Sequence, residues 1–270
     1  SGIDTRLLSA ELPGEPLGLN LATTGQNPVD SYLYYQNLPA SVELVVQFAV
    51  PRFATYDDSI EPQKYNAMYM YGYRPNADTQ SRLNAIFAED TRSILGTTGL
   101  GQRFASRWAV RQTADNLVRR IVRQDLQFDS YTFDLYFPKT GVDRLADAEM
   151  QRAIKIRYRG IEHDFPPKEI KSSFFIEAGS RVADLGKTFV LVISPIHPDV
   201  HERYGEEWYS QVRDYFHGLG ESGNFAVIDA TDAVPGADYV DALHLSETGA
   251  EVLTEFVAGE IRRLNLEPQG

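Results

Sequence analysis

Two residues near the C-terminus, Asp241 and His244, have the types and the spacing of an acid–base pair. They stand in the stretch DALHLSETGAEVL, directly before a segment with the pattern of a final helix. An Asp three residues before a His can accept the Nδ1 proton of that ring from within a turn, which leaves Nε2 to act as a general base. The same spacing also arises where a loop Asp caps a helix beside a partly buried His. The chemistry requires a nucleophile as its third group.

Composition narrows the class of protein. The chain has 270 residues, 43% of them hydrophobic and 24% charged, which is enough for one large domain with a sizeable core. Its net charge of −12 argues against nucleic acid as a partner, because nucleic-acid binding depends on basic contacts to phosphate. The sequence has no cysteine, which excludes disulfides and a cysteine nucleophile and fits an exported protein as well as a cytoplasmic one. No apolar run approaches the roughly 20 residues of a membrane-spanning helix.

Strand and helix patterns alternate along the chain and predict an α/β fold, a three-layer sandwich around a mainly parallel sheet. Apolar runs predict strands at 17–22, 42–50, 188–194 and 225–230, and the run at 42–50 is rich in β-branched residues. Helical spacing is found at 29–36, 79–95, 102–126, 169–186, 206–219 and 246–264. We interpret residues 1–270 as a single domain with a helical insertion at about 60–185. Within the insertion, the Tyr-rich stretch at 65–75 could either line a sugar-binding cleft or serve as packing.

The closing segment DALHLSETGAEVLTEFVAGEI resembles the last block of the SGNH (GDSL-like) hydrolase family, in which an Asp and a His precede a final amphipathic helix. Three upstream segments resemble other parts of that family in the same order. NLATTGQNPVDSYLYYQNL is similar to the second block, VELVVQFAVPRF is placed like the third strand, and KTFVLVISPIHPD is placed like a later strand. The resemblance implies the flavodoxin-like SGNH fold and leaves the helical insertion unmatched.

By this resemblance the protein would be a serine esterase or O-acyltransferase that acts on an acylated cell-envelope or extracellular glycan. His244 would be the general base, Asp241 its orienting partner, and Gly25 an oxyanion donor through its backbone N–H. The family's third block usually supplies an Asn as a further donor, and Asn27 or Arg52 would have to replace it. A glycan or acyl-ester substrate is implied as the partner, with no metal or other cofactor.

The first block of the family, a buried strand followed by a Gly-x-Ser turn with the nucleophile, is missing from the sequence. SGIDTRLLSAEL looks like the family segment a few residues after that turn, so we expect the Ser upstream of residue 1, in a longer chain. SGNH proteins with a long insertion are often held at the membrane by an N-terminal helix. By this resemblance the protein would be exported or envelope-associated, with a membrane anchor upstream. The missing block also leaves a second interpretation, a catalytically inactive SGNH-like protein that binds a glycan or a partner in polysaccharide assembly or export.

Two further groups could carry chemistry. Ser194 ends a buried strand on the presumed active edge and is a rival nucleophile, although a Ser before Pro more often terminates a strand. His197 and His201, with Asp199 between them, have a metal-like spacing. Pro198 argues against the helix that would align such a pair. We therefore interpret these three residues as belonging to a surface loop.

Overall fold

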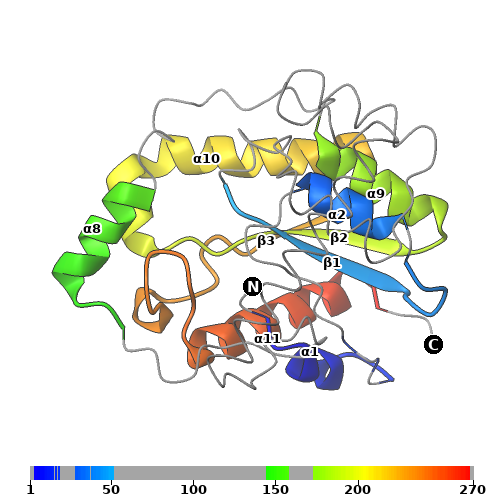
Figure 1. Cartoon of the computed structure of the whole chain (residues 1–270), viewed down its shortest axis with the longest axis horizontal. Coiled ribbons are helices and arrows are strands. Elements are labelled where there is room, and N and C mark those ends of the chain that lie inside the picture. The colour runs from blue at the N-terminus through cyan, green and yellow to red at the C-terminus, as the bar shows by residue number, and fades with distance from the viewer. Residues whose placement is uncertain are drawn as a thin grey trace, which may run out of the picture.

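The computed structural model describes residues 3–14, 16, 18, 28–36, 38–51, 144–157 and 173–267. These residues form a mixed α/β structure in which helices cover both faces of a parallel sheet (Figure 1). The elements expected at 79–95 and 102–126 lie outside the described residues, as does the Tyr-rich stretch at 65–75, and of the strand expected at 17–22 only Gly18 is described. The α/β class predicted from the sequence is confirmed.

The sheet contains three described strands, β1 (Leu44–Ala49), β2 (Thr188–Ile193) and β3 (Ala226–Asp229), in the order β1–β2–β3. Both pairings are parallel, with Ala49 opposite Ile193 and Ile193 opposite Asp229. All three strands therefore end at one edge of the sheet. The strand predictions at 42–50, 188–194 and 225–230 are confirmed.

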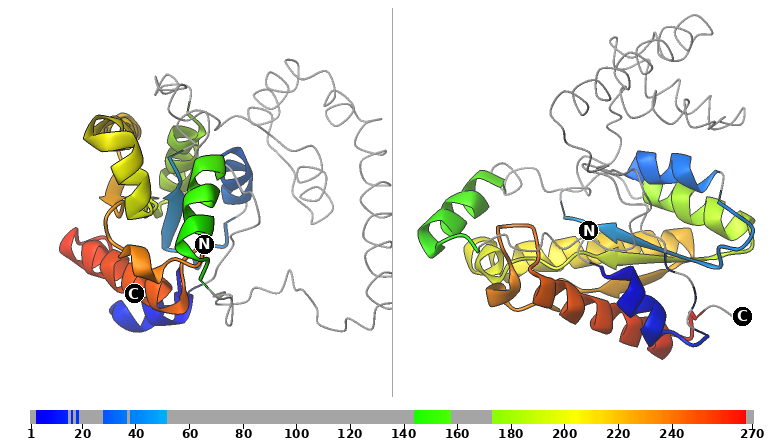
Figure 2. Two further views of the ribbon diagram at one scale, coloured as in Figure 1. Left: turned by 90° about the vertical axis from the view of Figure 1, so that its left-hand side faces the viewer. Right: turned by 60° about the horizontal axis from the view of Figure 1, so that its bottom comes forward.

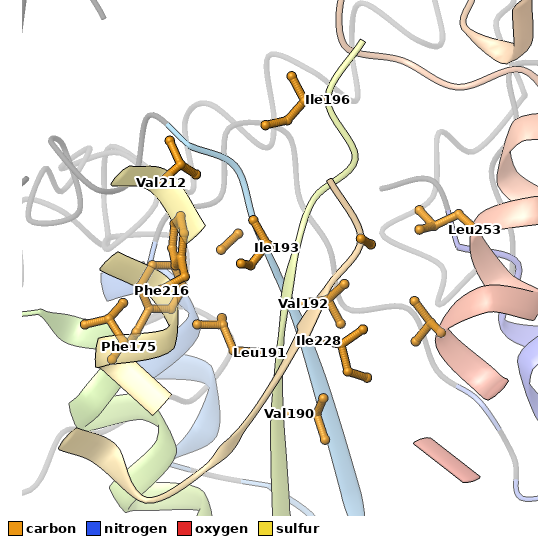
Figure 3. Packing of buried hydrophobic residues seen from close by; sticks show 14 of the residues in the cluster. Phe175, Val190, Leu191, Val192, Ile193, Ile196, Val212, Phe216, Ile228 and Leu253 are labelled. Carbon is orange, nitrogen blue, oxygen red and sulfur yellow. The ribbon is translucent and has the colours of Figure 1, made fainter. Parts of the chain in front are cut away.

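The central strand β2 is covered on both faces, and five of its six residues are buried. Successive side chains of a strand point to opposite faces. Leu191 and Ile193 accordingly point toward Phe216, whereas Val192 points to the side of Leu253 (Figure 3). One apolar run thus contributes to the core on both sides of the sheet.

Two groups of helices make these contacts (Figures 1 and 2). On one face, α9 (Phe174–Asp184) packs against β2 and against α2 (Pro28–Tyr35), and α10 (Pro198–Gly223) packs against β2 and β3. On the other face, α1 (Thr5–Glu11) packs against α11 (Glu247–Arg263). The helices predicted at 29–36, 169–186 and 246–264 are confirmed, each to within a few residues.

Helix α10 corrects one sequence prediction. Pro198 was expected to prevent a helix, but it is the first residue of α10. Proline is tolerated at that position because its missing N–H would have no partner within the helix. The helix therefore starts eight residues before the predicted 206–219 segment, and it is kinked at Gly205, whose φ is 79°.

Helix α8 (Asp147–Arg157) was not predicted. Its contact with the rest of the protein depends on two buried side chains one turn apart, Met150 and Ile154, and on a hydrogen bond from Gln151 to Asp199 of α10 (2.7 Å). So narrow an apolar face gives a weak periodic signal. No described helix has both the length and the apolar composition required to span a membrane.

Gly220 allows α10 to approach β3 closely, and this contact can be tested. A Cβ at Gly220 would lie 2.5 Å from Val227 Cγ2 and 3.0 Å from the Phe225 carbonyl oxygen. We expect Gly220→Ala to lower the free energy of unfolding by about 1–3 kcal/mol, because the Val227 side chain must shift and the Phe225 oxygen leaves little room beside it. Urea unfolding measures this change.

Gly259→Ala in α11 is the matched control. A Cβ at Gly259 would have nothing within 4 Å, and alanine favours a helix over glycine by about 0.5–1 kcal/mol. The control should be as stable as the wild type or more stable. Equal unfolding free energies of the two variants would contradict the close approach of α10 and β3.

Candidate active site

A short turn between the 3-10 helix η2 (Gly236–Asp238) and α11 carries the predicted pair Asp241 and His244. Tyr239 and Leu245 form an isolated antiparallel bridge, and the N–H of Val240 donates to the carbonyl of His244 (2.9 Å). The segment therefore folds back on itself and holds 241–244 at its tip. It follows the carboxyl end of β3, the edge at which ligands bind in parallel sheets.

Both carboxylate oxygens of Asp241 organise this tip. Oδ1 accepts the backbone N–H groups of Leu243 and His244, each at 2.9 Å. Oδ2 lies 2.7 Å from Nδ1 of His244. Because an ionised carboxylate can only accept, Nδ1 carries the proton and Nε2 keeps its lone pair. The structure thus brings together the two residues that the spacing predicted, in the contact expected of an orienting carboxylate and a base.

The electrostatics of the pair keep the carboxylate charged. Partial burial raises the pKa of Asp241, but hydrogen bonds from the His244 ring and from two backbone N–H groups outweigh it, so this pKa lies below its usual value. The His244 side chain is 57% exposed. Its Nε2 has no hydrogen bond within the described part of the chain. This nitrogen is therefore available to a group that approaches from outside.

The other predicted site residues, Gly25, Asn27 and Arg52, lie outside the described residues. Their nearest described neighbours are Pro28, which begins α2, and Pro51, which follows β1. Pro51 thus lies near the carboxyl end of its strand, the sheet edge from which the turn also departs. The oxyanion donors stay a prediction.

The metal-like group at 197–201 differs from the sequence interpretation. His197 is buried and caps α10, and His201 lies within that helix, so the surface-loop interpretation was wrong. His201 instead pairs with Glu206 (2.8 Å) and stacks on Tyr209 (ring centroids 4.0 Å apart). Among the described residues, no group of three or more His, Asp and Glu side chains could hold a metal ion.

Ser194, the rival nucleophile, is the residue directly after β2 and is 9% exposed. Its backbone N–H donates to the carbonyl of Ala49 (2.8 Å), which continues the ladder between β1 and β2. No hydrogen bond among the described residues joins it to Asp241 or His244. These contacts agree with a residue that terminates a strand.

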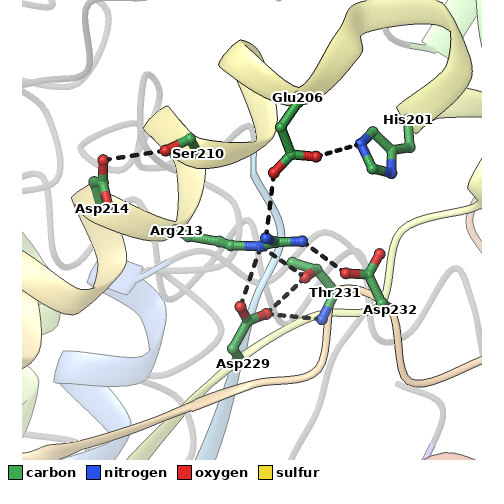
Figure 4. Close-up of polar contacts among 8 residues, drawn as sticks. All are labelled: His201, Glu206, Ser210, Arg213, Asp214, Asp229, Thr231 and Asp232. Atoms are coloured by element: carbon green, nitrogen blue, oxygen red, sulfur yellow. Dashed lines mark hydrogen bonds and ion pairs between the residues drawn. The ribbon is translucent and has the colours of Figure 1, made fainter.

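A polar network at the end of β3 was missed from the sequence (Figure 4). Arg213 of α10 pairs with Asp229 (3.2 Å) and Asp232 (2.6 Å), and also with Glu206 (3.6 Å). Thr231 donates to Asp229 through both its N–H and its hydroxyl. The network ties α10 to the segment that leads toward the turn. The available sequence signal was an Asp at the end of a strand, followed by Thr and Asp.

Comparisons with known proteins assign no family to the chain. No protein-family model matches it, and no curated protein matches it. Function is therefore inferred from the residues and their geometry.

The lowered pKa of Asp241 predicts how its contribution to stability depends on pH. A carboxyl whose folded pKa lies below its unfolded value of 3.8 stabilises the fold above that value, and the contribution is lost as the pH falls through the folded pKa. Asp241→Asn should therefore be less stable than the wild type at pH 7, and the difference should begin to shrink as the pH falls below about 3.8. Urea unfolding between pH 7 and pH 3 measures it.

Glu255→Gln is the control for this measurement, because Glu255 is exposed on α11. We expect its free energy of unfolding to follow that of the wild type over the whole pH range. A stability difference between Asp241→Asn and the wild type that does not change with pH would mean that the Asp241 charge contributes nothing.

Proposed function

We propose that this chain belongs to an SGNH-type serine esterase or O-acyltransferase that acts on an acylated cell-envelope or extracellular glycan. The observation that carries the proposal is the Asp241–His244 pair, with Oδ2 2.7 Å from Nδ1 in the turn that follows the last strand. A carboxylate that fixes this tautomer leaves Nε2 of His244 to take the proton of a nucleophilic Ser. The Ser is proposed to lie upstream of residue 1.

The packing of α1 supports a nucleophile supplied from that direction. The N–H of Asp4 donates to Thr254 Oγ1 (3.0 Å), and the carboxylate of Glu11 pairs with Arg262 (3.0 Å). The two contacts occur in the same order along both helices, so α1 and α11 run parallel. The start of α1 therefore lies beside the N-terminal half of α11, which begins directly after the turn with His244. The proposed Ser would have to reach Nε2 from this side.

The proposed reaction proceeds in two steps. Nε2 of His244 takes the proton of the Ser hydroxyl as its oxygen attacks the acyl carbonyl, and the backbone N–H of Gly25 stabilises the oxyanion, helped by Asn27 or Arg52. His244 then returns the proton to the departing sugar oxygen, and an acyl-enzyme is left. Water or a second sugar hydroxyl gives its proton to His244 as it attacks the acyl group, and His244 passes this proton to the Ser oxygen as the acyl–Ser bond breaks. Water gives an esterase and a sugar hydroxyl gives a transferase.

The test is turnover of p-nitrophenyl acetate by the full-length protein. His244→Ala should lower kcat by about a thousandfold or more, because the general base is lost. His217→Ala, which removes an exposed ring from α10, is the matched control and should keep wild-type turnover. Unchanged turnover in His244→Ala would rule out this mechanism.

A second candidate is a catalytically inactive SGNH-like protein that binds a glycan or a partner in polysaccharide assembly or export. It is favoured by the lack of any described hydroxyl hydrogen-bonded to Nε2 of His244. A fluorophosphonate probe separates the two candidates in the full-length protein. An enzyme should be labelled at one Ser, whereas a binding protein should stay unlabelled and still bind a glycan saturably.

A further inference from the structure

The turn with Asp241 and His244 rests on a buried histidine from a distant part of the chain. His197 follows β2 and its side chain is 2% exposed. Its ring lies edge-on to the ring of Tyr239, with the centroids 4.9 Å apart. Tyr239 is 1% exposed and forms one side of the bridge that closes the turn. This contact between two buried rings joins the segment after β2 to the base of the turn.

The protonation of His197 is fixed by its contacts. Nδ1 accepts the backbone N–H of Asp199 in the first turn of α10 (3.2 Å), so the ring proton is on Nε2. Burial lowers the pKa of His197 below its usual value and outweighs the Asp199 carboxylate and a backbone hydrogen bond with Gly236, which both raise it; the nearby Arg144 lowers it further. The backbone of Gly236 lies against the same ring, since a Cβ there would be 3.5 Å from Cε1 of His197. His197 is therefore a neutral aromatic ring packed beneath the turn.

We propose that His197 is a positioning residue, whose buried ring holds Tyr239 and thereby keeps Asp241 in the place from which it orients His244. A contribution of His197 to catalysis rests on the proposed function, whereas its effect on the Asp241–His244 contact can be measured on this chain alone.

The physical reason is that the Asp241 and His244 side chains are partly exposed, so their placement depends on the buried backbone that carries them. Asp241 and His244 are 37% and 57% exposed in their side chains, so neither is fixed by surrounding packing. The buried base of the turn has to supply the rigidity. Removal of the His197 ring would leave a cavity beside Tyr239 that the neighbouring backbone could relax into. A shift of about 1 Å at Asp241 would be enough to impair the contact with His244.

The readout is the tautomer of His244. A free neutral imidazole prefers its proton on Nε2, and the contact with Asp241 reverses that preference to Nδ1. Ring ¹⁵N shifts and two-bond couplings report the tautomer of each histidine separately. In the wild type at neutral pH, we expect His244 to carry its proton on Nδ1 and His197 to carry it on Nε2.

Two substitutions separate the ring of His197 from its capping nitrogen. His197→Phe keeps a ring against Tyr239 and loses the acceptor for Asp199 N–H, whereas His197→Asn keeps an acceptor and loses the ring. We expect His197→Phe to retain the Nδ1–H tautomer of His244 and His197→Asn to reduce its population at least twofold. In the full-length enzyme, His197→Asn should lower kcat about tenfold to a hundredfold with little change in KM. His217→Asn is the control and should change neither readout.

An unchanged His244 tautomer in His197→Asn would overturn the proposal. An equal loss of the Nδ1–H tautomer in His197→Phe and His197→Asn would also overturn it, because the hydrogen bond to Asp199 N–H, and not the ring, would then be responsible. If His197→Asn fails to fold, Tyr239→Leu removes the same contact from the other side and should give the same loss. A tautomer change without any ester turnover in the full-length protein would refute the proposed function and leave the positioning role intact. If ester turnover requires His244 and is unchanged in His197→Asn, the proposed function stands and the positioning role of His197 is refuted.

Discussion

The central strand β2 imposes the main constraint on this protein, because a strand buried on both faces needs a helical layer on each side. Helices α9 and α10 supply one layer and α11 contributes to the other. Parallel neighbours also require that the chain leave each strand at the same edge and return by a crossover. The segments after β2 and β3 therefore meet at that edge. Their meeting places His197, which follows β2, against Tyr239, which follows β3.

The two histidines near this edge show how surroundings decide protonation. His244 is exposed and faces a carboxylate, so its proton stays on Nδ1. His197 is buried and accepts a backbone N–H at Nδ1, so its proton stays on Nε2. Among the described residues the exposed ring has no partner on Nε2, whereas the buried ring packs edge-on against Tyr239. One residue type thus takes opposite tautomers in two neighbouring places.

The sequence predicted what is local and strongly patterned. Strand β2 was predictable because every residue of TFVLVI is apolar or β-branched. The Asp241–His244 contact was predictable because four consecutive residues of one turn contain it. Helix α8 was missed because only a narrow face of it is buried. The start of α10 was missed because Pro198 was interpreted as a breaker when it is the first helical residue. The pairing of Arg213 with Asp229 joins a helix to a strand end, and no local pattern encodes it.

The same turn is also attached to the segment before α8. The backbone N–H of Leu145 donates to the carbonyl of Val240 (2.9 Å), next to Asp241. Helix α8 is held in turn by the hydrogen bond from Gln151 to Asp199, whose own N–H donates to His197. The residues at 144–157 are therefore connected to the turn with Asp241 and His244 both directly, through Val240, and through Asp199 and His197.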